Sequence, residues 1–429
     1  MVFCFLMSLR GRVLAEIKEE DCINLIKELV PAGQPDAEDP LDPDQLPGWE
    51  EGFSAVIAKK LIELGFEVKM YAGSVGRPNV VGRLEGTVGK PILILNDHLD
   101  TYPAGDPLEW TMTNFDPYNP TVHGRKLYAR GTSDTRGNMA CQLMAIKALR
   151  KVGVEFRGNL IAAYTVDEER NGFFGSKFLL EERGLKGDYE ITAEPTSWTN
   201  NEEWGMDIAI ASSGHCILEI ETKGFKSHIW RPDVGVNPIM KMAKLLLEME
   251  KMEFSHKQPK AYGSTKPMIC VVKIEAGKPK ETQFTPATCK ARVLVVGIVP
   301  GMTPETTIND IEVLIERIKQ KDKDFQAEVR QMKGYTFIPA TLEVSEDALH
   351  LKALVKAYKE ILGREPKFYR KNAFTDSIQF SLHGIPALTF GPGVDGWWPV
   401  NEYIEIDKVV AATKIYALAI MDILGVTNE

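Results

Sequence analysis

Residues 91–100, PILILNDHLD, join a continuous apolar run to a group of polar side chains. Two later segments have the same form: 160–169, LIAAYTVDEE, and 189–195, YEITAEP. Continuous apolar strands that alternate with helical stretches predict an α/β fold with a mainly parallel sheet covered by helices. Because the carboxyl ends of parallel strands line the ligand crevice of such sheets, we expect the polar groups at these three ends to converge.

The converging groups are acids and one imidazole: His98, Glu168, Glu169 and Glu194, joined by Asp134 just ahead of the helical stretch 137–152. Desolvating such a cluster is costly unless a cation holds it, so we predict a divalent metal. The mixed nitrogen and oxygen donors favour Zn, Mn or Co over Ca. Taken alone, Asp134 also fits a helix cap, and residues 167–169 fit a solvated loop. The agreement of three strand ends favours the metal site.

The rhythm of the chain changes between residues 213 and 330. There the order of strand-like and helix-like segments is βαββαβ, which is typical of a ferredoxin-like α+β domain. After residue 330 the alternation of apolar strands and helices returns. We therefore predict a discontinuous catalytic domain, 1–212 with 331–429, and an inserted domain, 213–330.

Composition limits the classes of partner. The chain has 429 residues with 51 basic and 60 acidic side chains, a net charge of −9 that argues against nucleic acid. No run approaches the ~20 apolar residues of a membrane span. Six scattered cysteines without a CxxC pair fit a reducing compartment, so we expect a cytoplasmic protein that binds small molecules. We interpret the N-terminal segment as something other than a signal peptide, and we expect translation to start at Met1 or Met7.

Five blocks in order resemble the M20 metallopeptidase and deacylase family, which includes carboxypeptidase G2-like, acetylornithine deacetylase-like and succinyl-diaminopimelate desuccinylase-like enzymes. Residues 97–138, DHLDTYPAG…GRKLYARGTSDTRGN, resemble its GHxDxVP…GRGxxDxKG signature. The other four blocks are VDEERNGFFGSKFL (166–179), ITAEPT (191–196), GFKSHIWRPDVGVNPI (224–239) and TDSIQFSLHGIPALTFGPG (375–393).

The resemblance implies a role for each matching residue. His98, Asp134 and Glu194 are implied to bind one metal, and Asp134 to bridge to a second metal that Glu169 helps hold. Glu168 is implied to be the general base, and Asp100 to orient the imidazole of His98. The inserted domain is implied to form a homodimer, or a larger homo-oligomer, in which His228 of one subunit stabilises the oxyanion at another subunit's site.

Three positions depart from the family pattern. Asp97 stands where glycine is usual before the histidine ligand. Val295 and Gly297 replace an Asp-x-Arg pair whose arginine can clamp a substrate carboxylate, and Arg231, Arg292 and Lys226 are the candidate substitutes. Trp398 falls where the last histidine ligand of the second metal is expected, three residues before Asn401. Indole offers no lone pair to a metal, so we predict one firmly bound ion per chain.

We predict hydrolysis of a C–N bond, by metal-activated water with Glu168 as general base, in a small N-acyl amino acid or dipeptide-like substrate. Trp398, Asn401, Arg231 and Gly391 are the predicted substrate contacts. The alternative on the same scaffold is hydrolytic deamination of an amino-aromatic acid, which the missing arginine and an aromatic wall at Trp398 suit. A binding protein without catalysis is disfavoured, because it needs no base.

Overall fold

The computed structural model describes residues 7–34, 50–196, 206–256, 266–278, 280, 282–393 and 400–428, and the chain divides into two compact units. The first comprises Met1–Ala211 and Glu343–Glu429, and the second Ser212–Leu342. The second unit runs past the expected end at 330 because the returning chain still pairs with its first strand. The N–H and C=O of Ile338 both bond the backbone of His215, at 3.0 Å.

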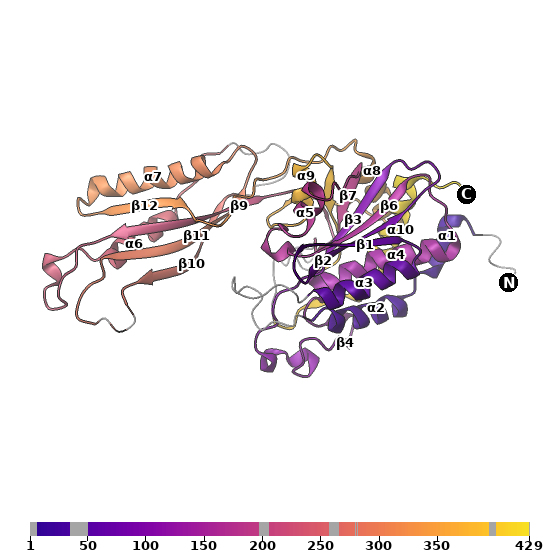
Figure 1. The fold of residues 1–429 in the computed structure, drawn as a ribbon, viewed down its shortest axis with the longest axis horizontal. Helices are drawn as coiled ribbons and strands as arrows, with labels where there is room; N and C mark the ends of the chain where they lie inside the picture. Colours follow the sequence, from indigo (N-terminus) through magenta and orange to yellow (C-terminus); the bar gives the residue numbers. More distant parts are fainter. Residues whose placement is uncertain are drawn as a thin grey trace. The chain divides into compact units, whose positions relative to one another are not determined.

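The first unit contains an eight-stranded mixed sheet, in the order β1-β2-β6-β3-β7-β14-β8-β13 (Figure 1). Its strands are β1 (Glu67–Ser74), β2 (Arg77–Leu84), β3 (Ile92–His98), β6 (Asn159–Thr165), β7 (Tyr189–Thr192), β8 (Ile208–Ser212), β13 (Phe368–Lys371) and β14 (Ala387–Thr389). The central strands β6, β3, β7 and β14 pair in parallel, as expected. β1, β2 and β8 pair antiparallel, so the sheet is less uniformly parallel than we predicted.

The apolar runs of the sequence form the buried centre of this sheet. Leu93, Ile94 and Leu95 of β3 are fully buried, which requires cover on both faces. Eight helices belong to this unit among the described residues: α1 (Leu9–Glu16), α2 (Glu19–Ala32), α3 (Glu51–Glu63), α4 (Gly137–Val152), α5 (Ser176–Glu181), α8 (Leu349–Leu362), α9 (Ser377–Leu382) and α10 (Ile406–Leu424). α10 packs against α4 and α8, and α5 packs against α9.

A three-stranded sheet lies at the edge of the site. Its order is β15-β5-β4, formed by β4 (Thr121–His123), β5 (Lys126–Tyr128) and β15 (Tyr403–Glu405). The pairing of β15 with β5 brings Glu402, which directly precedes β15, beside the segment 129–134. Two stretches far apart in sequence therefore meet at Asp134.

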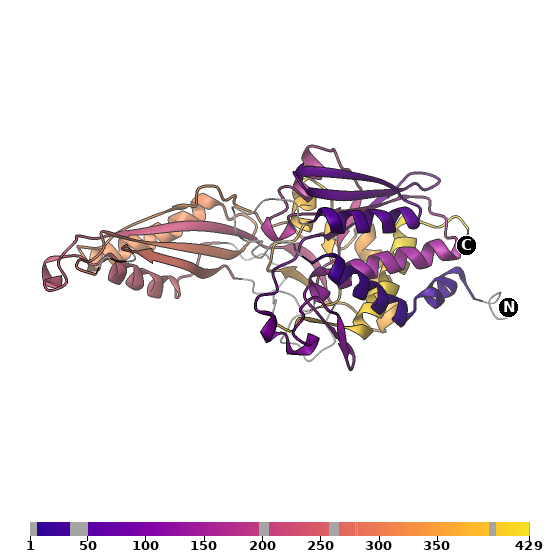
Figure 2. The same ribbon diagram turned by 60° about the horizontal axis from the view of Figure 1, so that its bottom comes forward.

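The second unit has the predicted βαββαβ order: β9 (Gly214–Lys223), α6 (Pro238–Met249), β10 (Met268–Ala276), β11 (Thr288–Ile298), α7 (Pro304–Lys321) and β12 (Gln326–Gln331). Its antiparallel sheet runs β10-β11-β9-β12, with α6 and α7 lying along the strands (Figure 2). Alternate residues of β9 are buried, and Leu218 and Ile220 share one core with Leu245 of α6 and Ile311 of α7. Among the described helices of both units, none is long and apolar enough to cross a membrane.

Candidate metal centre

Three strand ends and one loop supply the polar side chains of the site. β3 ends at His98, the single 3-10 turn Glu168–Arg170 follows β6, and Glu194 follows β7. One ligand atom each from His98, Asp134 and Glu169 lie within 4.8 Å of one another, and so do atoms of His98, Glu168 and Glu194. The resemblance implies that His98, Asp134 and Glu194 bind one metal. In the structure Asp134 belongs to the first of these groups and Glu194 to the second, and His98 belongs to both.

The imidazole of His98 is fixed between two carboxylates. Its Nε2 lies 2.9 Å from Asp134 Oδ1, and its Nδ1 lies 3.3 Å from Asp100 Oδ1 and 3.1 Å from Asp100 O. Burial lowers the pKa of His98, but its bonds to Asp100 and Asp134 outweigh this and hold the pKa well above its usual range. Nε2 is therefore the nitrogen that faces the cluster.

Asp100 also holds the turn that carries the two adjacent glutamates. Its Oδ1 accepts the N–H of Glu168 at 3.2 Å and its Oδ2 accepts the N–H of Glu169 at 3.1 Å. Its main-chain oxygen accepts Arg136 Nη1 at 2.7 Å. Asp100 thus orients one imidazole and one turn at the same time, as supporting groups around metal sites do.

In the described part of the structure, four carboxylates share this cluster with one imidazole, which cannot offset their charge alone. Burial first, and then the neighbouring acids, raise the pKa of Glu168 and of Glu169 well above the usual range. Glu169 Oε1 is buried and accepts no hydrogen bond from the residues that the structure describes. A divalent cation bound by imidazole nitrogen and carboxylate oxygens would satisfy that oxygen and offset the repulsion, so these residues fit a metal.

Comparison with known proteins decides what kind of site this is. Residues 94–422 match the model of Peptidase family M20/M25/M40. The chain belongs to this family. The M20 resemblance read from the sequence is confirmed, and the chain is a metallohydrolase of the class that cleaves amide bonds with a divalent metal.

Its M20 relatives cover most of its length. It is 29% identical over 386 residues to the N-formyl-4-amino-5-aminomethyl-2-methylpyrimidine deformylase of Bacillus subtilis, covering 85% of this chain and 87% of the relative. It is 26% identical to a succinyl-diaminopimelate desuccinylase of Rickettsia bellii, covering 86% and 91%. The fold is similar to that of the di-peptidase Dug1p from Saccharomyces cerevisiae, with a TM-score of 0.74, 15% identity, and 99% and 100% covered.

Two residues of this M20 site were missed in the sequence. Glu402 is buried and accepts the N–H groups of Gly131, Ser133 and Asp134 at 2.9, 2.7 and 3.1 Å, and Arg130 Nη1 at 2.8 Å. It therefore holds the loop that presents Asp134. The intact Asn-Glu-Tyr motif next to Trp398 was the available signal.

The second missed residue is Lys371 at the end of β13. Its side chain is buried, with Nζ 3.3 Å from Glu194 Oε2 and 3.0 Å from Pro195 O. A buried ammonium group beside Glu194 compensates part of the negative charge of the cluster. No local pattern in FYRKN indicates this, because the contact joins segments that are distant in sequence.

Other predicted residues of the first unit have structural partners. Asp97 Oδ1 accepts the N–H of His98 at 2.6 Å and the hydroxyl of Thr135, and burial raises the pKa of this carboxyl well above its usual range. Asn401 Oδ1 accepts the N–H of Met112 at 2.9 Å. A Cβ on Gly391 would lie 1.9 Å from Asn138 Oδ1, so the glycine permits close packing behind Glu194.

The remaining predicted residues belong to the second unit or to undescribed parts of the chain. Trp398 is outside the described residues. His228 and Arg231 belong to the second unit, where both are exposed. The His228 ring packs edge-on against Phe284 with centroids 5.4 Å apart, and Arg231 pairs with Asp233 at 2.8 Å.

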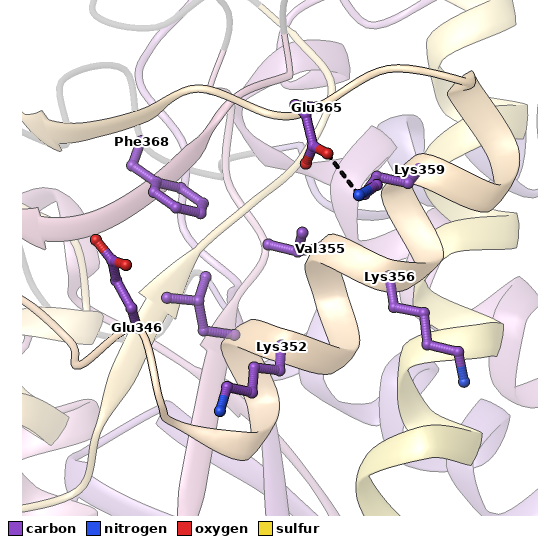
Figure 3. Close-up of a pocket in the computed structure, with 8 residues that line it drawn as sticks. Glu346, Lys352, Val355, Lys356, Lys359, Glu365 and Phe368 are labelled. Carbon is purple, nitrogen blue, oxygen red and sulfur yellow. Dashed lines mark ion pairs between the residues drawn. The ribbon is translucent and has the colours of Figure 1, made fainter.

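One surface pocket of about 440 Å³ lies between α8 and β13, and none of the metal-centre residues lines it (Figure 3). Lys352, Lys356 and Lys359 of α8 surround it, together with Val355 and Phe368. Each lysine pairs with a nearby acid, as Lys359 does with Glu365 at 2.5 Å. The basic side chains of the pocket are thus paired with acids at the surface.

Proposed function

We propose that this M20 enzyme hydrolyses the amide bond of a small N-acylated substrate, with Glu168 as general base. The observation that supports this most is the position of Glu168. Its carboxylate belongs to the His98 cluster, and its backbone neighbour Glu169 supplies the next ligand. A base beside the metal, on the same turn as a ligand, is what hydrolysis by activated water needs.

The contacts of each residue indicate its proposed role. His98, Asp134 and Glu194 would hold one metal, and Asp134 with Glu169 would hold a second, weaker one. Asp100 and Glu402 fix the two turns that carry Glu169 and Asp134. When bound, a divalent metal lowers the pKa of water toward neutrality and polarises the scissile carbonyl. Glu168 accepts a proton from that water and passes it to the leaving nitrogen. Burial raises the pKa of Glu168 well above its usual range, which makes the carboxylate a stronger proton acceptor.

We further propose one firmly bound ion per chain, Zn, Mn or Co. Trp398 stands where the family carries a histidine ligand, and its indole cannot replace imidazole. Asp134 and Glu169 alone would leave a second ion with two protein ligands. A second ion is then weakly held and lost on dialysis.

His228 is proposed as the oxyanion donor of a homo-oligomer built through the second unit. An imidazole N–H at the developing oxyanion would stabilise the transition state. The ring of His228 is exposed and its backbone is fixed by a bridge to Phe284, which suits a group offered to a second chain. Trp398, Asn401, Arg231 and Gly391 are proposed to contact the substrate.

The substrate class follows from two relatives whose printed names describe the removal of a formyl and a succinyl group from nitrogen. We propose a short N-acyl group on a small amine as the substrate, hydrolysed in the cytoplasm. The five described cysteines are free, which fits a reducing compartment.

A substrate panel tests this proposal. N-formyl, N-acetyl and N-succinyl amines, dipeptides and amino-aromatic acids are incubated with enzyme loaded with Mn, Co or Zn. Release of the carboxylic acid together with the amine supports the amide hydrolase. Ammonia release without acid would favour the aminohydrolase instead, and no turnover of any amide would overturn the proposal.

A further inference from the structure

The start of β2 makes side-chain contacts with the loop that carries the catalytic turn. Arg77 Nη1 donates to Asp167 Oδ1 at 2.9 Å, and Asp167 directly precedes Glu168. Two residues further along β2, Asn79 Oδ1 accepts the N–H of Val166 at 3.0 Å and Asn79 Nδ2 donates to Phe174 O at 2.8 Å. One strand thus holds both ends of the segment 166–174.

The loop needs such support at Asp167. This residue has a φ of 69°, in the left-handed region that non-glycine residues rarely adopt. Its Oδ2 accepts the N–H of Phe174 at 3.1 Å, which links the two ends of the loop 167–174. A conformation of this kind persists only where neighbouring groups determine it.

Arg77 is itself fixed from behind by Glu50, the residue ahead of α3. Arg77 Nε lies 2.9 Å from both carboxylate oxygens of Glu50, and the side chains of Glu50, Arg77 and Asp167 are all at least 95% buried. The forked guanidinium meets both acids with N–H groups in fixed directions, a geometry that the point charge of a lysine ammonium does not reproduce. Breaking such a buried chain leaves a charge without its partner.

We propose that Arg77 and Asn79 are positioning residues for the reaction, which set the place of Glu168 and Glu169 through Asp167 and Val166. The inference rests on the proposed function for what the turn does, and on the contacts above for how it is held. Asp100 fixes the same turn from the β3 side. The turn is therefore held from two strands, β2 and β3.

The test compares Arg77→Lys, Asn79→Ala and the control Arg83→Lys, which changes an exposed arginine on the same strand. Arg77→Lys keeps the positive charge, so we expect this variant to fold. A neutral substitution would instead leave two buried acids without a cation. Hydrogen exchange by mass spectrometry follows the peptide covering residues 166–174. Steady-state kinetics and competition with a chelator for Zn are measured on the same samples.

We expect exchange in residues 166–174 to rise about tenfold in both β2 variants and to stay unchanged in Arg83→Lys. We expect kcat to fall about 10- to 100-fold with KM within about twofold, and Zn affinity to fall with it. Unchanged exchange and Zn affinity in both variants would overturn the inference. Hydrogen exchange tests the contacts of Arg77 and Asn79 with the loop even if the wild type hydrolyses no amide. Failure of the wild type to hydrolyse any amide would overturn only the proposed function.

Discussion

Asp100 Oδ1 accepts the backbone N–H of Glu168 at 3.2 Å. The same oxygen lies 3.3 Å from Nδ1 of His98, so one carboxylate links the proposed base to a proposed ligand. The consequence is that a change at Asp100 should act on metal binding and on proton transfer together.

Asp100→Asn should lower both metal affinity and kcat by about 10- to 100-fold. The amide keeps the size of the carboxylate, but its NH2 group cannot accept the N–H of Glu169, and its contact with His98 changes. Chelator competition and steady-state kinetics measure the two effects. Asp106→Asn, at an exposed carboxylate, is the control. Loss of kcat with full metal affinity would contradict the double role.

Glu402→Gln should destabilise the protein and loosen the Asp134 loop. Three backbone N–H groups and Arg130 share the buried carboxylate, and an amide accepts on one side only. We expect a loss of about 2–4 kcal/mol in the free energy of unfolding, measured by urea titration. Glu85→Gln, at an exposed carboxylate, should change little. Equal stability of the two variants would show that the loop is held by other contacts.

His350 should make the stability of the protein depend on pH. Its ring is buried and stacked on Tyr189 with centroids 4.7 Å apart, and burial lowers its pKa to about 3. The unfolded chain titrates at about 6.5, so between these values it binds more protons than the folded chain. The free energy of unfolding therefore falls as pH falls through this window, by about 1.4 kcal/mol per pH unit for this group.

His350→Phe should remove that slope. Urea titrations of the wild type, of His350→Phe and of the exposed-site control His123→Phe between pH 4.5 and 7, a range of about two and a half units, give the comparison. We expect the control to keep the slope of the wild type. A slope that His350→Phe leaves unchanged would mean that the buried ring takes up a proton in the folded state.

Trp398→His should create a tighter second metal site. The substitution adds an imidazole at the sequence position where the family pattern has a histidine. The proposed second site would then have a third ligand besides Asp134 and Glu169. After dialysis, we expect about two equivalents of Zn per chain in the variant and about one in the wild type and in Trp397→His. Two equivalents in the wild type would refute the single-ion proposal.

The sequence predicted those parts of the fold that depend on local pattern. The run 91–95 became β3, the stretch 137–152 became α4 with those bounds, and the inserted segment has the expected strand order. The antiparallel edge was missed, although the two residues between β1 and β2 include Gly76 with a φ of 71°, which suits a hairpin turn. Antiparallel pairing follows from so short a connection.

For the site, sequence reasoning selected the residues at strand ends, with Asp100 as a support for His98, but missed the more distant supporting residues. Glu402, Lys371 and Arg77 act through contacts with segments far away in the chain, which no local motif records. The grouping of ligands around His98 likewise depends on side-chain directions that spacing does not define.

The central claim is that Glu168 is the base of a metal-dependent amide hydrolase, and Glu168→Gln tests it most directly. Turnover of the best substrate and metal content are measured on the wild type, on Glu168→Gln and on Glu169→Gln. We predict that Glu168→Gln loses at least about 10²-fold in kcat while it retains its metal, whereas Glu169→Gln retains the firmly bound metal and loses affinity for a second ion. Activity of Glu168→Gln close to that of the wild type, with the metal bound, would contradict the claim.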